Sequence, residues 1–190
     1  MRSLYKSLIA VILLGITMPP ALAQGSGGGP TILEDFTMQP ETRWRFFTDQ
    51  VMGGVSTGAV GFVQEEGRPF ARMTGLVSTA NLGGFIQMRL DLAAPPPDGS
   101  IGVRLVVRGN DQHYFVHLRT TATLLPWQYY QAGFDVTAGW TEVRLPYDGF
   151  EASGALLAKV PASAGLTSLG IVAYGRDHEA LIDVAEVGFY

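Results

Sequence analysis

Residues 85–92 alternate between apolar and mostly polar side chains, and this period of two constrains the fold more than any other feature of the sequence. One side of the run carries Ile86, Met88, Leu90 and Leu92. The other side carries Phe85, Gln87, Arg89 and Asp91. Successive side chains of a β-strand point to opposite faces, so the run predicts a strand with one face in the core and one at a polar surface. The following Pro95-Pro96-Pro97-Asp98-Gly99 must end the ladder, because proline has no amide hydrogen to donate.

Similar short runs, bounded by glycine, proline or aspartate, fill most of the remaining chain. They cover residues 31–36, 44–48, 57–64, 70–77, 101–108, 113–120, 128–134, 141–146, 166–174 and 180–189. About ten short strands, with turn residues at roughly 8 to 12 residue spacing and no alternation with helices, predict an antiparallel β-sandwich. Only residues 151–160 could hold a short helix. We therefore expect an all-β fold with at most that one helical segment.

The first 30 residues are expected to lie outside this fold. Arg2 and Lys6 precede an apolar run that is too short to span a bilayer, and Ala21-Leu22-Ala23 has the small-x-small pattern of a cleavage site. Residues 1–23 are therefore predicted to be a signal peptide, residues 24–30 a flexible Gly/Ser tether, and residues 31–190 a single domain. The mature protein would be periplasmic or extracellular, with no transmembrane span after cleavage.

Composition excludes several classes of function. The chain has 13 Lys and Arg against 17 Asp and Glu, and no basic cluster, so a nucleic-acid partner is not expected. It has no cysteine and no phosphate loop, so neither catalysis nor a cofactor is expected. His113 and His117 would stand about 13 Å apart on one strand face, too far to share a metal ion. The acids at turns are expected to be solvated, which leaves open a structural calcium or a hydrolase that uses a carboxylate pair.

The segment Asp49-Gln50-Val51-Met52-Gly53-Gly54-Val55-Ser56 is the most distinctive loop. Paired glycines between two strands let the backbone adopt positive φ or approach another segment closely. The polar side chains of this loop could bind a ligand, or they could satisfy the turn's own amides. Asn81, Gly83 and Gly84 form a second glycine-rich turn that could pack beside the first.

Strand periodicity also places arginines and aromatic residues on shared faces. Gln87 shares a face with Arg89, as does Arg104 with Arg108, and Trp127, Tyr129 and Gln131 line a further strand. The strand at 113–120 presents either His113, Phe115, His117 and Arg119 or Tyr114, Val116 and Leu118. Such a face suits stacking on sugar rings or anchoring a protein. The alternative is that the arginines pair with turn acids such as Asp49 and Asp91 and stabilise loops.

Several segments, in order along the chain, together resemble one known family. They are residues 49–56, 75–78, 81–85, 108–110 with Tyr114, 118–120, 129–134 and 140–146. The set resembles the complex I intermediate-associated protein 30 family over roughly residues 32–190, and D-x-V-M-G-G-V-S is its most specific part. Gln50 departs from the motif, which more often has a small or acidic residue there.

The resemblance implies a galactose-binding-like jelly roll and, for the mitochondrial members, a non-enzymatic assembly factor of respiratory complex I. Those members act from the matrix side, whereas this chain begins with an export signal. We therefore expect an exported, non-catalytic module that binds a protein partner, such as a membrane-complex subunit or an assembly intermediate; the alternative is a carbohydrate-binding module. The candidate binding residues are Asp49, Gln50, Gly53, Gly54, Ser56, Asn81, Gly84, Arg89, Arg108, Tyr114, Arg119, Tyr129 and Gln131.

Overall fold

The structure is a computed structural model that describes residues 29–190. The predicted signal peptide and most of the predicted tether lie outside the described residues. Within residues 29–190, no helix is both long and apolar enough to cross a membrane.

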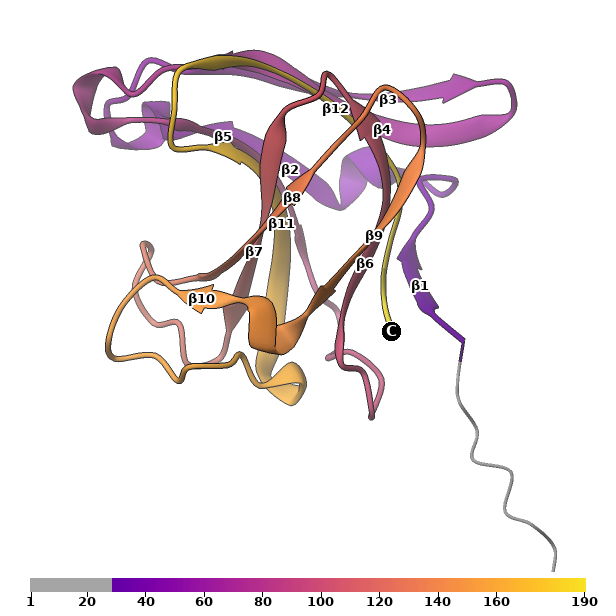
Figure 1. Cartoon of the computed structure of the whole chain (residues 1–190), viewed down its shortest axis with the longest axis vertical. Helices are drawn as coiled ribbons and strands as arrows, with labels where there is room; N and C mark the ends of the chain where they lie inside the picture. Colours follow the sequence, from indigo (N-terminus) through magenta and orange to yellow (C-terminus); the bar gives the residue numbers. More distant parts are fainter. Residues whose placement is uncertain (1–28) are drawn as a thin grey trace, which may run out of the picture.

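The chain forms two six-stranded sheets, here called sheet A and sheet B (Figure 1). Sheet A runs in the order β3 (Thr57–Glu65), β4 (Arg68–Val77), β12 (His178–Phe189), β6 (Gly102–Gly109) and β9 (Thr141–Pro146). The short strand β1 (Thr31–Glu34) pairs with the C-terminal end of β12. Sheet B runs in the order β10 (Glu151–Ala152), β8 (Tyr130–Asp135), β7 (His113–Thr120), β11 (Leu166–Tyr174), β5 (Phe85–Asp91) and β2 (Trp44–Thr48). Neighbouring strands are antiparallel throughout. The predicted antiparallel β-sandwich is confirmed.

The core lies between the inner faces of the two sheets. Ile86 and Met88 of β5 are completely buried, as the alternation of residues 85–92 predicts. The two alternatives for β7 are resolved: Tyr114, Val116 and Leu118 are completely buried, so His113, Phe115, His117 and Arg119 face outward. The outer face of sheet B therefore carries polar and aromatic side chains from several strands.

Short 3-10 helices connect the strands, and none lies within residues 153–160. They are η1 (Pro40–Thr42), η2 (Asp49–Met52), η3 (Ala80–Leu82), η4 (Tyr147–Gly149) and η5 (Ser163–Gly165). The possible helix at 151–160 is not formed: Glu151 and Ala152 pair with β8, and turns follow. So short a segment cannot stabilise a helix without packing, and Leu156 is 91% exposed.

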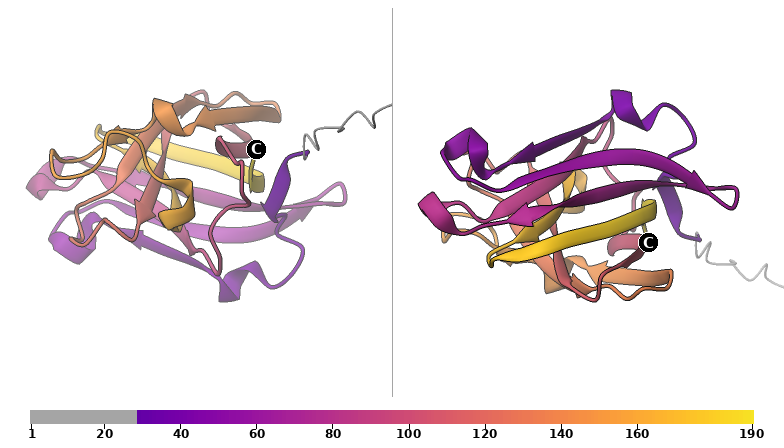
Figure 2. Two further views of the ribbon diagram at one scale, coloured as in Figure 1. Left: turned by 90° about the horizontal axis from the view of Figure 1, so that it is seen from below. Right: turned by 90° about the horizontal axis from the view of Figure 1, so that it is seen from above.

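The loops that contain η2 and η3 lie side by side at one end of the molecule, away from the C-terminus (Figure 2). η2 connects β2 to β3 and η3 connects β4 to β5, so each loop joins one sheet to the other. This arrangement places both loops at the rim of the outer face of sheet B.

Candidate functional site

Asp49 joins the two glycine-rich loops. Its fully buried carboxylate accepts hydrogen bonds from the Ser56 amide (2.9 Å) and hydroxyl (2.5 Å). It also accepts from the amides of Gly84 (2.5 Å) and Phe85 (3.2 Å). Burial alone would raise the pKa of Asp49, but these donors stabilise the charged form and hold the pKa below its ordinary value of 3.8. Asp49 therefore stabilises the loops and is not accessible to a ligand.

The glycines act as the sequence predicts. Gly53 has a φ of +92°, and Gly54 approaches so closely that an added Cβ would overlap the Asp49 carboxyl group. An added Cβ on Gly83 would overlap the same carboxyl and lie 3.0 Å from the Gly54 Cα. The second glycine-rich turn thus packs beside the first, as the sequence left possible.

The polar side chains of the first loop bond within that loop or to its neighbours. Ser56 is completely buried, and its hydroxyl also accepts a hydrogen bond from the Ser78 amide at 3.0 Å. The Gln50 side-chain amide donates to the Ser56 carbonyl at 2.9 Å. Asn81 is exposed in η3 at a φ of +57°.

The two loops also expose three aliphatic side chains. Val51 is 74% exposed, Met52 66% and Leu82 95%. The hydrogen-bonded framework around Asp49 thus supports an exposed aliphatic surface, which the sequence analysis did not identify.

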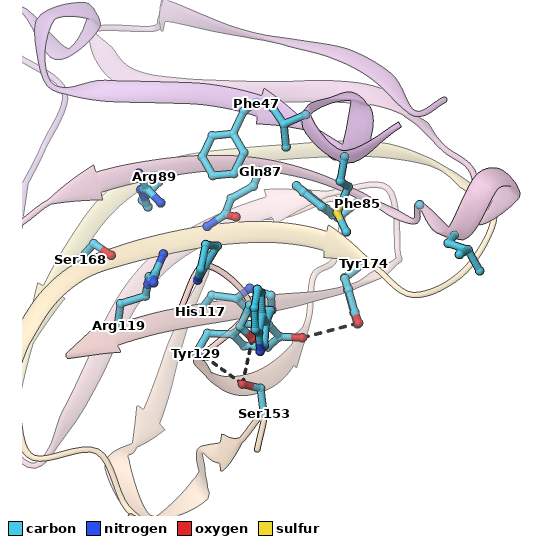
Figure 3. Close-up of a pocket in the computed structure, with 16 residues that line it drawn as sticks. Phe47, Phe85, Gln87, Arg89, His117, Arg119, Tyr129, Ser153, Ser168 and Tyr174 are labelled. Carbon is cyan, nitrogen blue, oxygen red and sulfur yellow. Dashed lines mark hydrogen bonds between the residues drawn. The ribbon is translucent and has the colours of Figure 1, made fainter. Parts of the chain in front are cut away.

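These aliphatic side chains, here called the aliphatic wall, help to line a pocket of about 680 Å³. Figure 3 shows this pocket on the outer face of sheet B. The pocket is lined by Phe47, Val51, Met52, Leu82, Gly83, Phe85, Gln87, Arg89, His117, Arg119, Pro126, Trp127, Tyr129, Ser153, Ser168 and Tyr174. No carboxylate is among these residues. Gly170 lies between Arg89 and His117 in the sheet, and the Gln87 side chain covers the space that a side chain at position 170 would occupy. The Gln87 side chain therefore forms the floor at the middle of the pocket.

An aromatic cluster forms the opposite wall. The His117 ring stacks on Tyr129, with centroids 4.1 Å apart and planes 11° apart, and His117 Nε2 lies 2.9 Å from the Gln131 amide oxygen. Burial lowers the pKa of His117 to about 4, although the Gln131 hydrogen bond opposes the shift. Burial also raises the pKa of Tyr129. Trp127, which is 68% exposed, lies beside them on a loop that Ser153 holds by accepting from the Tyr129 amide and donating to the Trp127 carbonyl.

The other end of the pocket is basic. Arg89 and Arg119 lie at this end, and Ser168 and Gln87 are their polar neighbours in the pocket lining (Figure 3). Ser168 is opposite Asp91 on β5 and opposite Arg119 on β7. Of the predicted arginine-and-aromatic face, Arg89, Arg119 and Tyr129 line one pocket, and Gln131 contacts His117 of that pocket.

Two of the candidate residues, Arg108 and Tyr114, lie outside both the pocket and the glycine-rich loops. Arg108 is on the outer face of sheet A, where it donates to Asp183 (2.7 Å) and Glu65 (2.5 Å). Tyr114 is completely buried, with its hydroxyl donating to Asn110 and accepting from the Leu181 amide, each at 2.8 Å. Strand periodicity defines the face of a strand but not the sheet to which it belongs, so β5 and β6 looked equivalent in sequence.

Several residues of the pocket were absent from the candidate set. They are Phe47, Val51, Met52, Leu82, Phe85, Gln87, His117, Pro126, Trp127, Ser153, Ser168 and Tyr174, with Gly83 between the loops. Strand periodicity already grouped Gln87 with Arg89, and it gave His117 as one of two choices. Nothing in the sequence indicated that β11 would lie between β5 and β7. Within residues 29–190, no group of three or more His, Cys, Asp or Glu side chains could hold a metal ion.

Known structures share this fold at low sequence identity. The family 11 carbohydrate-binding module of the cellulase Lic26A-Cel5E of Clostridium thermocellum superposes with a TM-score of 0.67 at 10% identity, over 85% of this chain and 94% of the module. The Clostridium thermocellum module in complex with a β-1,3-1,4-mixed-linked tetrasaccharide gives a TM-score of 0.68 at 10% identity, over 85% and 95%. The family 30 module of the Clostridium thermocellum cellulase Cel9D-Cel44B gives 0.51 at 12% identity, over 70% and 82%. These similarities show a common β-sandwich fold.

The sequence itself identifies the family. No curated protein sequence matches the chain. The family model described as complex I intermediate-associated protein 30 (CIA30) matches residues 35–180, from the end of β1 into β12. This chain therefore belongs to the complex I intermediate-associated protein 30 family.

Proposed function

We propose that this protein is an exported, non-catalytic assembly-factor-like module that holds a segment of a partner protein in the pocket of sheet B. The observation that carries the proposal is the wall of exposed aliphatic side chains, Val51, Met52 and Leu82, which lines the same pocket as the exposed Trp127. Exposed apolar surface is unfavourable in water and typically marks a site of association. Membership of a family described by its association with a complex I intermediate supports a protein partner.

The way this wall is supported also favours binding. Asp49 links η2 to Gly84 and Phe85, so the aliphatic side chains stand on a fixed framework. A preformed surface loses less conformational entropy on association than a flexible one does. Val51, Met52 and Leu82 are therefore suited to contact apolar side chains of a partner.

The chemistry of the pocket supports a non-catalytic role. General acid-base work needs a titrating group near the operating pH. The pocket has no carboxylate in its lining, and burial lowers the pKa of His117 to about 4. The His117 ring is also hydrogen-bonded to Gln131 and stacked on Tyr129. The pocket thus offers contacts for binding.

Site-specific photo-crosslinking in the native envelope tests the proposal. A photoreactive amino acid at Leu82 in the pocket wall would be compared with one at Leu156, which is also almost fully exposed but lies outside the pocket. We expect one dominant protein adduct from position 82, absent from position 156 and lost when Trp127→Ala is added. Equal adducts from both positions, or none from position 82, would contradict the proposal.

A glycan ligand is the second candidate function. The stacked His117 and Tyr129 and the exposed Trp127 resemble surfaces on which sugar rings stack. One structural neighbour is a carbohydrate-binding module in complex with a tetrasaccharide. A glycan array in which binding depends on Trp127, together with an absence of adducts from position 82, would favour this function over a protein partner.

A further inference from the structure

Arg89 and Arg119 line the basic end of the pocket, and Arg45 lies next to Arg89. Arg45 and Arg89 are directly opposite each other on β2 and β5, and Asp91 forms an ion pair with both. Arg119 lies across β11 from them, opposite Ser168. Strands are about 4.8 Å apart, so β5 and β7 are separated by roughly 10 Å, and arginine side chains from both can approach one bound group.

Arg89 is only partly neutralised. Its Nε is buried without a hydrogen bond, and the nearest Asp91 oxygen, Oδ1, is 3.5 Å away, while Arg45 pairs with Oδ2 of the same carboxylate. The guanidinium lies 5.1 Å from the centroid of the Phe47 ring, which holds it over the floor of the pocket. Burial lowers the pKa of Arg89, and the charges of Arg45 and Arg119 act in the same direction. A buried donor without a partner is unfavourable, so the hydrogen-bonding capacity of the Arg89 guanidinium is not fully used within the described residues.

Arg119 has no acidic partner within residues 29–190. Its Nη2 donates to the carbonyls of Leu125 at 2.8 Å and Thr123 at 3.4 Å. These bonds fix the side chain and position the loop before Trp127, but they leave its charge without a counterion.

Three arginines of sheet A are different, because each of them is paired with two acids. Arg72 and Arg108 both contact Asp183 and Glu65, and Arg104 contacts Glu142 and Glu186. Where this chain uses arginine to stabilise its surface, it provides the carboxylates. The charge of Arg89 and Arg119 in the pocket, in contrast, is not balanced in this way.

Building on the proposed function, we infer that Arg89 and Arg119 form a carboxylate subsite, and that the occupant is an extended peptide segment with an acidic side chain flanked by apolar ones. The carboxylate would receive hydrogen bonds from Arg89 and Arg119, and paired N–H groups of arginine match the two oxygens of a carboxylate. The apolar residues would contact the wall formed by Val51, Met52 and Leu82. Charge complementarity at one end and aliphatic contacts at the other distinguish this occupant from a neutral glycan.

Selection from a displayed library of random dodecapeptides on the purified protein tests the inference. We expect selected peptides to share one Asp or Glu next to apolar residues. A synthetic peptide of that sequence and its Glu→Gln or Asp→Asn counterpart would then be titrated against the protein and its Arg89→Gln, Arg89→Lys and Arg144→Gln variants. Arg144 is an exposed arginine on sheet A and serves as the matched control.

Loss of the peptide carboxylate should weaken binding to the unaltered protein by about tenfold or more, as expected for a charged hydrogen bond. The same loss should have little effect on Arg89→Gln, because the two changes remove one interaction. Arg89→Lys should retain part of the affinity, Arg144→Gln all of it, and Arg89→Gln should not lower the Tm.

Three outcomes would overturn the inference. Selected peptides without an acidic position, bound equally by the protein and Arg89→Gln, would refute the carboxylate subsite and leave the proposed function intact. Failure to select any peptide would refute both. Binding of the acidic polysaccharide polygalacturonate that depends on Arg89, without selection of peptides, would assign the basic end to a glycan instead.

Discussion

Asp49 connects two loops that are far apart in the sequence through four hydrogen bonds to its carboxylate. Asp49→Asn retains the shape but removes the charge and replaces one accepting oxygen by a donor that faces backbone amides. We expect the free energy of unfolding to fall by about 2 to 4 kcal/mol, the effect of losing charge-assisted bonds and leaving buried donors unpaired. Urea denaturation at pH 7 measures this loss. Asp98→Asn, at an exposed acid in a turn, should change stability by less than about 0.5 kcal/mol.

The pKa of Asp49 adds a dependence on pH. Because the folded pKa lies below the ordinary value of 3.8, the unfolded chain binds a proton first as the pH falls. The contribution of Asp49 to stability is therefore complete at neutral pH and is lost as the pH falls through 3.8 and below. Asp49→Asn should lack this acid-dependent part, and an unchanged acid profile would contradict the role given to the carboxylate.

His117 acts in a higher pH range. Its folded pKa of about 4 lies below the ordinary 6.5, because burial disfavours the imidazolium. Between these values the unfolded chain binds a proton that the folded protein does not, so stability should fall by up to about 3 kcal/mol as the pH drops from 6.5 to 4. His117→Gln should flatten this slope in urea midpoints measured from pH 7 to pH 4.5. The pKa of His178 is also lowered by burial, so His178→Gln is the comparison, and an equal effect of both variants would contradict this assignment to His117.

At the scale of elements, the sequence predicted which face of each strand is buried, but it did not predict which strands pair with one another. The alternation of residues 85–92 correctly separated buried Met88 from outward-facing Arg89. It could not show that β11 lies between β5 and β7, because pairing depends on contacts distant in sequence. The glycine loop around Asp49 was recognisable, but its exposed aliphatic side chains were not, since an apolar residue in a short turn can point either way.

The same loops provide a test of close packing. A methyl group on Gly54 would overlap the buried Asp49 carboxyl, which has no room to move because four donors hold it. Gly54→Ala should therefore lower the free energy of unfolding by at least about 2 kcal/mol, as overpacking does. The control is Gly61→Ala on the edge strand β3, where nothing lies within 4 Å of an added Cβ and stability should stay the same or rise slightly. Equal Tm values for the two variants would show that the loops are not packed as described.

At the scale of the whole molecule, the two outer faces have different organisation. On sheet A, Phe70 points outward yet is only 1% exposed, because the Trp140 ring and the guanidinium groups of Arg72 and Arg108 cover it. Those arginines also pair with the buried carboxylate of Asp183. Sheet A thus pairs Arg72, Arg104 and Arg108 with acids, whereas the face of sheet B has a pocket with an exposed aliphatic wall and incompletely balanced arginines. Composition could not reveal this contrast, since it depends on which sheet each arginine joins.

This difference predicts that stability and binding can be changed independently from the two faces. Trp127→Ala on sheet B removes a side chain that is 68% exposed, so the free energy of unfolding should change by less than about 0.5 kcal/mol. If Trp127 anchors the partner, the affinity for the partner should fall by about 30-fold, the effect of losing a typical hot-spot residue, and the yield of the adduct from position 82 should fall with it. Arg72→Ala on sheet A should do the reverse: it leaves Asp183 with one of its two arginines and should cost about 1 to 3 kcal/mol of stability while adduct yield stays unchanged. Parallel urea denaturation and crosslinking of both variants measure the two effects, and a loss of adduct in Arg72→Ala under conditions where it remains folded would place part of the binding surface on sheet A.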